Sequence, residues 1–371
     1  MVILMPDTHI RSGASLAADR GAAQLDSPPR DLRDDPRADP RMVAALAPFG
    51  LDRQPPPLSV SAASPREALL DYAAQTEANF GGLFDALLGG LAPVERVSRQ
   101  TVTVAGRDGN DLSLRIHRPA GRPGDATLPC VVQFHGGGGV ILSTLDSCYE
   151  RWRDELAAQG AVVIGVEFRN AAGKLGNHPY PAGLEDCAAA TVWALEHRAE
   201  LGANTVVVAG ESGGGNLALA VALKAAREQW RHRPDGVYAL APMIASPWDK
   251  PAALPSQREN DGYLISCALL AVMGALYDPL AAHATDALCW PYHAGDAELV
   301  GLPPHVISVN ELDPLRDEGQ GYQRRLVRNG VSAVGRVVMG TVHTADVFFR
   351  AAMPDVYAAT IRDICGFARE L

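Results

Sequence analysis

The chain has 371 residues, of which 47% are hydrophobic, 6% aromatic and 20% charged, and its formal net charge is −10. This composition excludes disorder over most of the length, because disordered chains lack the apolar area that offsets their conformational entropy. The negative charge argues against nucleic acid as a partner, since binding to phosphates relies on Lys and Arg. The length exceeds the roughly 250 to 300 residues at which one core stops growing, so we expect a large domain with a cap.

The N-terminal part is predicted to be an arm followed by a helix. Met1–Ile10 lacks the basic start and apolar run of a secretion signal. Ser27–Pro57 is rich in Pro, Asp and Arg, which predicts an extended or partly mobile arm without regular structure. Ser64 as N-cap and Pro65 in the first turn then predict the start of a helix. We therefore assign residues 1–92 to an arm and cap helices.

Residues 93–371 show the pattern of an α/β domain. Alternating apolar residues after the turn at residues 108–110 indicate an antiparallel hairpin at a sheet edge. Short apolar runs then alternate with helical periods, which predicts a mostly parallel sheet with helices on both faces. The runs are Cys130–Phe134, Ala161–Val166, Thr205–Ala209, Val237–Leu240, Val306–Val309 and Val334–Val338.

Helical and Pro-rich sequence at about residues 245–291 interrupts the alternation of strands and helices. We expect a cap insertion there, over the carboxyl edge of the sheet. Its uncharged stretch, Gly262–Tyr277, is shorter than the roughly 20 residues of a membrane span and indicates a buried or lid helix. No membrane span is therefore expected.

The cysteines show no C-x-x-C pair, which fits neither a disulfide scaffold nor a zinc site. We expect them to be buried thiols in a reducing compartment, which predicts a cytoplasmic location. They are Cys130, Cys148, Cys187, Cys267, Cys289 and Cys365.

The segment Gly210–Gly214 fits the G-x-S-x-G pattern and lies between a predicted strand and a predicted helix. In that setting the glycines permit a tight turn that exposes the hydroxyl of Ser212 as a nucleophile. The alternatives are a Gly-rich helix start and a phosphate cradle. A phosphate site would need Lys and Ser or Thr after the glycines, or a G-x-G-x-x-G pattern, and neither follows here.

A second Gly-rich loop, His135–Gly139, also follows a predicted strand. Successive glycines let backbone N–H groups converge on one point, as stabilisation of an oxyanion requires. We predict donors at Gly137 and Gly138, with a third at Gly213, the residue after the nucleophile. A flexible surface turn is the alternative. His135 itself is expected to organise the loop rather than act as a base.

A serine nucleophile needs an imidazole as base and a carboxylate that orients it. In the nucleophile-elbow fold the chain order is Ser, acid, His, and His343 is the only histidine after residue 309. Asp313 is the preferred acid because the proline after it holds it out of a helix. Glu311 is the second candidate.

These motifs together resemble the hormone-sensitive-lipase-like bacterial esterases of the α/β-hydrolase superfamily. The resemblance rests on H-G-G-G at residues 135–138, G-E-S-G-G at residues 210–214, D-P-L-R-D-E at residues 313–318 and the late His343. It covers about residues 94–371. It implies hydrolysis of a small-molecule carboxylic ester without metal or organic cofactor, and an N-terminal helical cap.

The sequence departs from the family pattern at three places: Thr344 follows the late His in place of Gly, Gly213 replaces the commoner Ala, and the segment at residues 169–178 is longer. A ligand receptor on the same fold, an amidase and a thioesterase remain alternatives. The oligomeric state also stays open, a homodimer included. The pocket is expected to include Trp248, Tyr263, Leu264 and Trp290.

Overall fold

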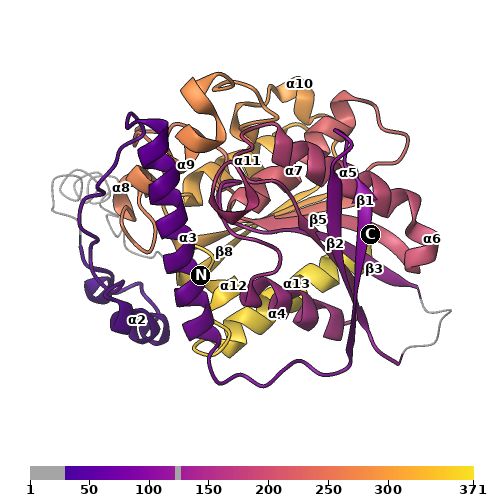
Figure 1. Cartoon of the computed structure of the whole chain (residues 1–371), viewed down its shortest axis with the longest axis horizontal. Coiled ribbons are helices and arrows are strands. Elements are labelled where there is room, and N and C mark those ends of the chain that lie inside the picture. Colours follow the sequence, from indigo (N-terminus) through magenta and orange to yellow (C-terminus); the bar gives the residue numbers. More distant parts are fainter. Residues whose placement is uncertain (1–29, 122–126) are drawn as a thin grey trace, which may run out of the picture.

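The computed structural model describes residues 30–121 and 127–371. The prediction about a secretion signal at Met1–Ile10, and the first three residues of the arm, lie outside this part. Eight strands form one sheet in the order β1-β2-β4-β3-β5-β6-β7-β8 (Figure 1). Their bounds are β1 Val97–Ala105, β2 Asp111–Pro119, β3 Leu128–Phe134, β4 Val162–Glu167, β5 Ala203–Glu211, β6 Gly236–Leu240, β7 His305–Leu312 and β8 Ala333–Val342.

The sheet is antiparallel only where β2 pairs with β1 and with β4, and β3 to β8 run parallel. This confirms the predicted edge hairpin and the mostly parallel sheet. In the sheet, β4 pairs with one edge of β3, and β5 pairs with the other edge. In open α/β sheets the loops after two such strands diverge and leave a crevice at the carboxyl edge. The loops that follow β3 and β5 therefore flank the expected position of a site.

Helices cover both faces of the sheet. On one face lie α4 and α13, and on the other lie α5, α7 and α11 (Figure 1). The main bounds are α4 Ser147–Ala158, α5 Ala182–Glu196, α7 Gly213–Arg227, α11 Arg316–Arg328 and α13 Pro354–Glu370, with short helices α6 Arg198–Leu201, α10 Asp296–Leu299 and α12 Ala345–Phe348.

The central strands are buried on both faces, as their unbroken apolar runs predict. In β3, Val131 packs into the core shared with α4 and α13, whereas Val132 and Phe134 pack into the core shared with α5 and α7. Successive side chains of a strand point to opposite faces, so a single apolar run supplies both cores.

The N-terminal arm contains more regular structure than its composition predicts. It forms α2 at Pro40–Leu46, in which Asp39 accepts a hydrogen bond from the Arg41 N–H as N-cap. Met42 and Leu46 are fully buried, and Arg41 forms an ion pair with Asp355 at the start of α13. The expectation of an arm without regular structure is wrong for this part, because buried side chains hold a short helix against the domain.

The predicted cap helix is present as α3, Arg66–Leu88, but Ser64 does not cap it. Pro65 occupies the N-cap position, and the Ser64 hydroxyl accepts a hydrogen bond from the Ser61 N–H instead. The ring of Pro65 disfavours helical backbone at the residue before it, which leaves Ser64 outside the first turn.

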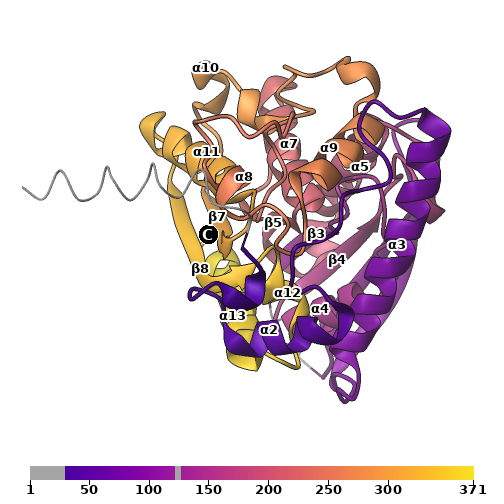
Figure 2. The same ribbon diagram turned by 90° about the vertical axis from the view of Figure 1, so that its left-hand side faces the viewer.

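The stretch between β6 and β7 contains α8 Ser256–Glu259 and α9 Cys267–Tyr277. The uncharged segment Gly262–Tyr277 thus contains α9, which lies next to α3. Figure 2 shows α3 along one flank of the molecule, with α8 and α9 beside the chain that joins α2 to α3. None of the helices in the described ranges is long and apolar enough to cross a membrane.

His305 is a titratable group buried at the start of β7. Its side chain is 1% exposed, and its Nδ1–H donates to the Pro303 carbonyl over 2.6 Å. Burial lowers the pKa of His305 to about 4. Because the unfolded chain takes up this proton at higher pH, stability is lost as pH falls from about 6.5 toward 4.

We predict that His305→Gln weakens the acid sensitivity of folding. The wild type loses free energy of unfolding between pH 7 and pH 5. In the variant this loss should be smaller by about 2 kcal/mol, the linkage value for one such group. Urea denaturation followed by Trp fluorescence at both pH values measures it. His232→Gln, at an exposed position, is the matched control, and an unchanged fall in the His305 variant would contradict the prediction.

Candidate active site

The predicted nucleophile, Ser212, lies at a sharp turn between β5 and α7. Its φ of 57° is unusual for a residue with a side chain. Two backbone hydrogen bonds hold the turn: the Ser212 N–H donates to Leu240, and the Met243 N–H donates to the Ser212 carbonyl. A Cβ on Gly214 would lie 2.1 Å from the Phe134 carbonyl oxygen, and one on Gly210 2.3 Å from that of Gly214. The two outer glycines of the motif therefore allow a turn that no other residue fits.

The structure brings the three predicted triad residues together at the carboxyl edge of the sheet. His343 follows β8, and its Nε2 lies 2.9 Å from the Ser212 Oγ. Its Nδ1 lies 2.7 Å from Oδ2 of Asp313, which follows β7. With Nδ1–H donating to the carboxylate, Nε2 is left to accept the serine proton. Asp313 is fully buried and His343 is 6% exposed.

The second acid candidate, Glu311, points away from the imidazole. Its Oε2 accepts a hydrogen bond from the Gly340 N–H at 2.7 Å, which ties β7 to the end of β8. The other oxygen of Asp313 accepts from the Leu315 N–H. The end of the strand between them explains the choice, because Glu311 still belongs to β7 whereas Asp313 lies in the loop beyond it.

Thr344, where the family often has Gly, adopts a left-handed backbone with φ of 54°. Its N–H donates to Oδ1 of Asn310, and its hydroxyl donates to the carbonyl of His343. A side chain in this region is strained, and these bonds hold it there. The departure from Gly therefore leaves the imidazole in place.

The Gly-rich loop after β3 lies directly against the start of α7. Gly137 and Gly138 both have positive φ, and a Cβ on Gly137 would lie 2.2 Å from the Ile141 carbonyl oxygen. Within the described chain their N–H groups donate no hydrogen bond. Gly213 is the first residue of α7, so its N–H has no partner inside the helix. All three predicted donors are therefore available at one place.

A buried carboxyl that the sequence analysis missed holds this loop. Glu211 Oε1 accepts from the Gly136 N–H at 2.5 Å, and the Tyr149 hydroxyl lies 3.1 Å from the same nitrogen. Burial raises the pKa of Glu211 to about 8. The Gly136 N–H is thus engaged, whereas the next two residues, Gly137 and Gly138, line the pocket. Glu211 is the variable residue of the G-x-S-x-G pattern, and its place inside the motif was the available signal.

His135 organises the loop from within the core, as expected. Its side chain is fully buried, stacks on Phe168 and donates from Nδ1 to the Gly136 carbonyl. Burial lowers the pKa of His135 to about 3, so the ring is neutral at physiological pH.

The longer segment at residues 169–178 supports the same loop from the other side. The N–H groups of Ala171 and Ala172 donate to the carbonyls of Gly139 and Val140, and the Asn170 amide donates to that of Leu142. Glu77 of α3 accepts from the N–H groups of Leu142 and Lys174. The cap helix, the long segment and the Gly-rich loop are thereby joined.

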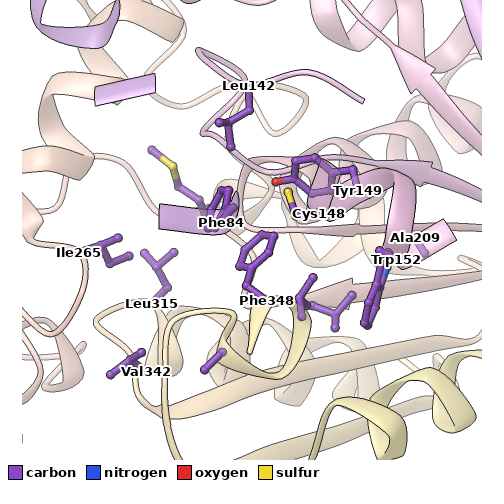
Figure 3. Packing of buried hydrophobic residues seen from close by; sticks show 14 of the residues in the cluster. Phe84, Leu142, Cys148, Tyr149, Trp152, Ala209, Ile265, Leu315, Val342 and Phe348 are labelled. Atoms are coloured by element: carbon purple, nitrogen blue, oxygen red, sulfur yellow. The ribbon is translucent and has the colours of Figure 1, made fainter. Parts of the chain in front are cut away.

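An apolar pocket of about 70 Å³ opens at Ser212 and His343. One face of α3 lines it with Phe80, Leu83, Phe84 and Leu87, opposite residues 264–273 of the cap. Phe84 stacks on Phe348 of α12 with ring centroids 4.2 Å apart, and Figure 3 shows both rings beside Tyr149. The sequence did not predict that α3 lines the pocket, because apolar residues of a helix have the same spacing whether they face a core or a pocket.

Of the four predicted pocket residues, only Leu264 lines this pocket. The expectation is wrong for Trp248, Tyr263 and Trp290, which are buried structural residues. Each donates its polar hydrogen to a carboxylate of Glu318, Asp35 or Asp278, respectively. A buried indole or phenol needs such a partner, and these partners lie away from Ser212.

Comparisons with known proteins show the family to which the chain belongs. A family model described as the alpha/beta hydrolase fold matches residues 131–347. The chain belongs to the α/β-hydrolase family. Esterase LipI of Mycobacterium tuberculosis is 34% identical over 258 residues, which cover 68% of this chain and 76% of that protein. Carboxylesterase NlhH of the same species is 34% identical over 287 residues, which cover 76% and 85%.

Solved structures place the chain within the family. A brefeldin A esterase, described as a bacterial homologue of human hormone-sensitive lipase, is 45% identical with a TM-score of 0.88 and covers 92% of this chain and 98% of its own. Esterase Est22 is 36% identical with a TM-score of 0.81, over 92% and 99%. The expected resemblance is confirmed, and the chain is a carboxylesterase of the hormone-sensitive-lipase-like group.

We predict that Gly213→Ala slows this esterase, although Ala is the commoner family residue. A Cβ on Gly213 would lie 2.5 Å from the Cα and 2.6 Å from the N of Gly138, so the loop must move. The turnover number should fall toward the about 10²-fold loss caused by removing one oxyanion donor. Rates with p-nitrophenyl acetate measure it. A variant with the same turnover number as the wild type would contradict the close approach of the Gly138 loop to Gly213.

We also predict opposite outcomes for the two acid candidates. Asp313→Asn places an amide against Nδ1 of His343 and favours the wrong tautomer, so kcat should fall by about 10⁴-fold. Glu311→Gln keeps a carbonyl oxygen for the Gly340 N–H and should stay within a few-fold of wild type. Steady-state kinetics on p-nitrophenyl acetate separate the two, and the reverse ranking would assign the acid to Glu311.

Proposed function

We propose that Ser212, His343 and Asp313 are the catalytic triad of this carboxylesterase, and that the N–H groups of Gly137, Gly138 and Gly213 form its oxyanion hole. One observation carries the proposal: an unbroken hydrogen-bonded chain runs from the Ser212 hydroxyl through the imidazole to a fully buried carboxylate.

In this mechanism the Ser212 oxygen attacks the ester carbonyl while His343 Nε2 takes the hydroxyl proton. The carbonyl oxygen becomes an oxyanion, which the three N–H groups stabilise. Asp313 keeps the imidazole oriented and stabilises its protonated form. His343 then gives the proton to the departing alcohol. Water repeats the sequence on the acyl-enzyme, releases the acid and restores the serine.

The substrates in this proposal are esters with small to medium acyl or aryl groups. The apolar lining of the 70 Å³ pocket supports an uncharged group next to the scissile bond. Residues 1–92 contain the arm and the cap helices, and residues 93–371 are the catalytic domain, which carries a cap insertion at about residues 245–291. The six cysteines are buried and free, which supports a reducing compartment such as the cytoplasm.

We predict that Ser212→Ala lowers kcat on p-nitrophenyl acetate by roughly 10⁴-fold or more, because triad members act as a unit. Circular dichroism and thermal unfolding verify that the variant folds. Retention of most of the turnover would refute the assignment of the nucleophile.

Labelling with an organophosphate, located by mass spectrometry, tests the same residue independently. We expect the adduct on Ser212 in the wild type and slow labelling in His343→Ala. A ligand receptor would bind an ester without turnover. An amidase or thioesterase would show a higher kcat/KM for the matched amide or thioester than for the ester.

A further inference from the structure

A buried asparagine outside the proposed triad contacts the chain on both sides of His343. Asn310 lies in β7 and is 2% exposed. Its Nδ2 donates to the Thr341 Oγ1 over 2.8 Å and to the Asp346 Oδ1 over 2.9 Å. Its Oδ1 accepts from the Thr344 N–H over 3.0 Å. One side chain therefore binds the segment that carries the imidazole with both ends of its amide.

The partners of Asn310 fix the orientation of this amide. The Thr341 hydroxyl already donates to the Val338 carbonyl over 2.7 Å, so its oxygen accepts a hydrogen from Asn310. A backbone N–H such as that of Thr344 can only donate, so it faces the Asn310 oxygen. The nitrogen and the oxygen of the amide thus both have partners, as a buried polar side chain requires.

The strand ladder does not hold the chain at this point. The register between β7 and β8 shifts between Asn310 and Leu312. Such an irregularity interrupts the regular backbone hydrogen bonds of a sheet. Two side chains of β7 bind the end of β8 instead: Glu311 accepts from the Gly340 N–H, and Asn310 binds the residues on both sides of His343. The position of the imidazole depends on these contacts.

Thr344 needs such a contact because of its backbone. Its φ of 54° lies in the left-handed region, which a residue with a side chain adopts only at a cost. It directly follows His343, so a change in its φ would move the chain that carries the imidazole. The hydrogen bond from its N–H to Asn310 stabilises the left-handed form. Glycine adopts this form without that cost and would not need the contact.

Asp346 anchors the amide of Asn310. It lies in α12 and is 2% exposed. Its Oδ1 accepts from Asn310, and its Oδ2 accepts from the Thr360 hydroxyl of α13 over 2.9 Å. Burial raises the pKa of Asp346. Its two partners are a neutral amide and a neutral hydroxyl, which need an acceptor rather than a charge.

From these contacts we propose that Asn310, anchored by Asp346, is a positioning residue for His343. Its amide fixes the backbone on both sides of the imidazole and allows a residue other than glycine at position 344. The inference rests on the proposed function, since it takes His343 as the base. Asn310 does not line the pocket, so its replacement should lower kcat and leave KM within a few-fold of wild type.

The test is a double-mutant cycle of Asn310→Ala and Thr344→Gly on p-nitrophenyl acetate. Asn310→Ala should lower kcat by about 10²-fold, the loss that a misplacement of about 1 Å causes. In the Thr344→Gly background the same substitution should cost at least about 10-fold less, because glycine leaves no left-handed strain for Asn310 to offset. This rescue would not follow from a general loss of stability.

Thr205→Val is the control for such a general loss. Thr205 donates a buried hydrogen bond to the Ala368 carbonyl near the amino end of β5, the end remote from Ser212. Its replacement should lower the melting temperature and keep kcat. For every variant, circular dichroism gives the folded fraction, and kcat is expressed per folded protein.

A second pair of variants tests the anchor and does not depend on the folding of Asn310→Ala. Asp346→Asn keeps an acceptor for the Asn310 amide and should keep kcat within a few-fold of wild type. Asp346→Leu has a similar shape but no acceptor, so it should lower kcat and leave KM nearly unchanged, as Asn310→Ala does. The same double-mutant cycle with Thr344→Gly should reduce the loss in Asp346→Leu.

Equal losses of kcat from Asn310→Ala with and without Thr344→Gly would overturn the proposal. Wild-type kcat in Asn310→Ala would overturn it too, as would equal kcat values in Asp346→Asn and Asp346→Leu. Failure of the proposed function looks different, because Ser212→Ala would then retain turnover of p-nitrophenyl acetate.

Discussion

The site depends on an unusually close approach of backbone to backbone at the ends of β3 and β5. The turn around Ser212 lies so near the Phe134 carbonyl and the Gly138 backbone that a single Cβ on Gly214 or Gly213 has no room. Only glycine permits such contact. The proposed nucleophile and the proposed oxyanion donors come from these two strand ends, so their mutual distance is fixed by the sheet rather than by flexible side chains.

Three carboxyl groups, of which Glu211 and Glu318 are buried, then fix the loops that the glycines leave without side-chain contacts. Glu211 holds the first glycine of the oxyanion loop, Glu77 holds its far end, and Glu318 accepts from the N–H groups of Ile244 and Ala245 beyond the elbow. A carboxyl oxygen gives each of these backbone N–H groups a partner, and an N–H group that is buried without one is costly. Flexible Gly-rich sequence becomes ordered here because each loop ends on such an acceptor.

The fold and the juxtaposition of the three proposed triad residues could be predicted because they leave local signals. Apolar runs mark the strands that bring Ser212, Asp313 and His343 to one edge, and the glycines around Ser212 mark the turn. The pocket could not be predicted in the same way. Phe84 and Leu87 repeat with ordinary helical spacing, and their role depends on where α3 packs. The predictions for Trp248 and Trp290 were wrong for the converse reason, since buried carboxyl groups 70 and 12 residues away in the chain accept hydrogen bonds from their indoles.

The same long-range dependence joins the N-terminal arm to Asp313, the proposed catalytic acid. Arg37 of the arm forms an ion pair with Asp35 and donates to the Asn260 side chain, and Asn260 donates to the carbonyl of Asp313. Tyr263 completes the cluster by donating to Asp35. Burial alone would raise the pKa of Asp35, but the hydrogen bonds from Arg37 lower it overall, so the cluster holds a carboxylate. Removing one partner from such a cluster leaves a charge without compensation. The arm is therefore coupled to the loop that orients the imidazole, and the part of the chain whose composition looked least structured helps to fix both the cap and the acid.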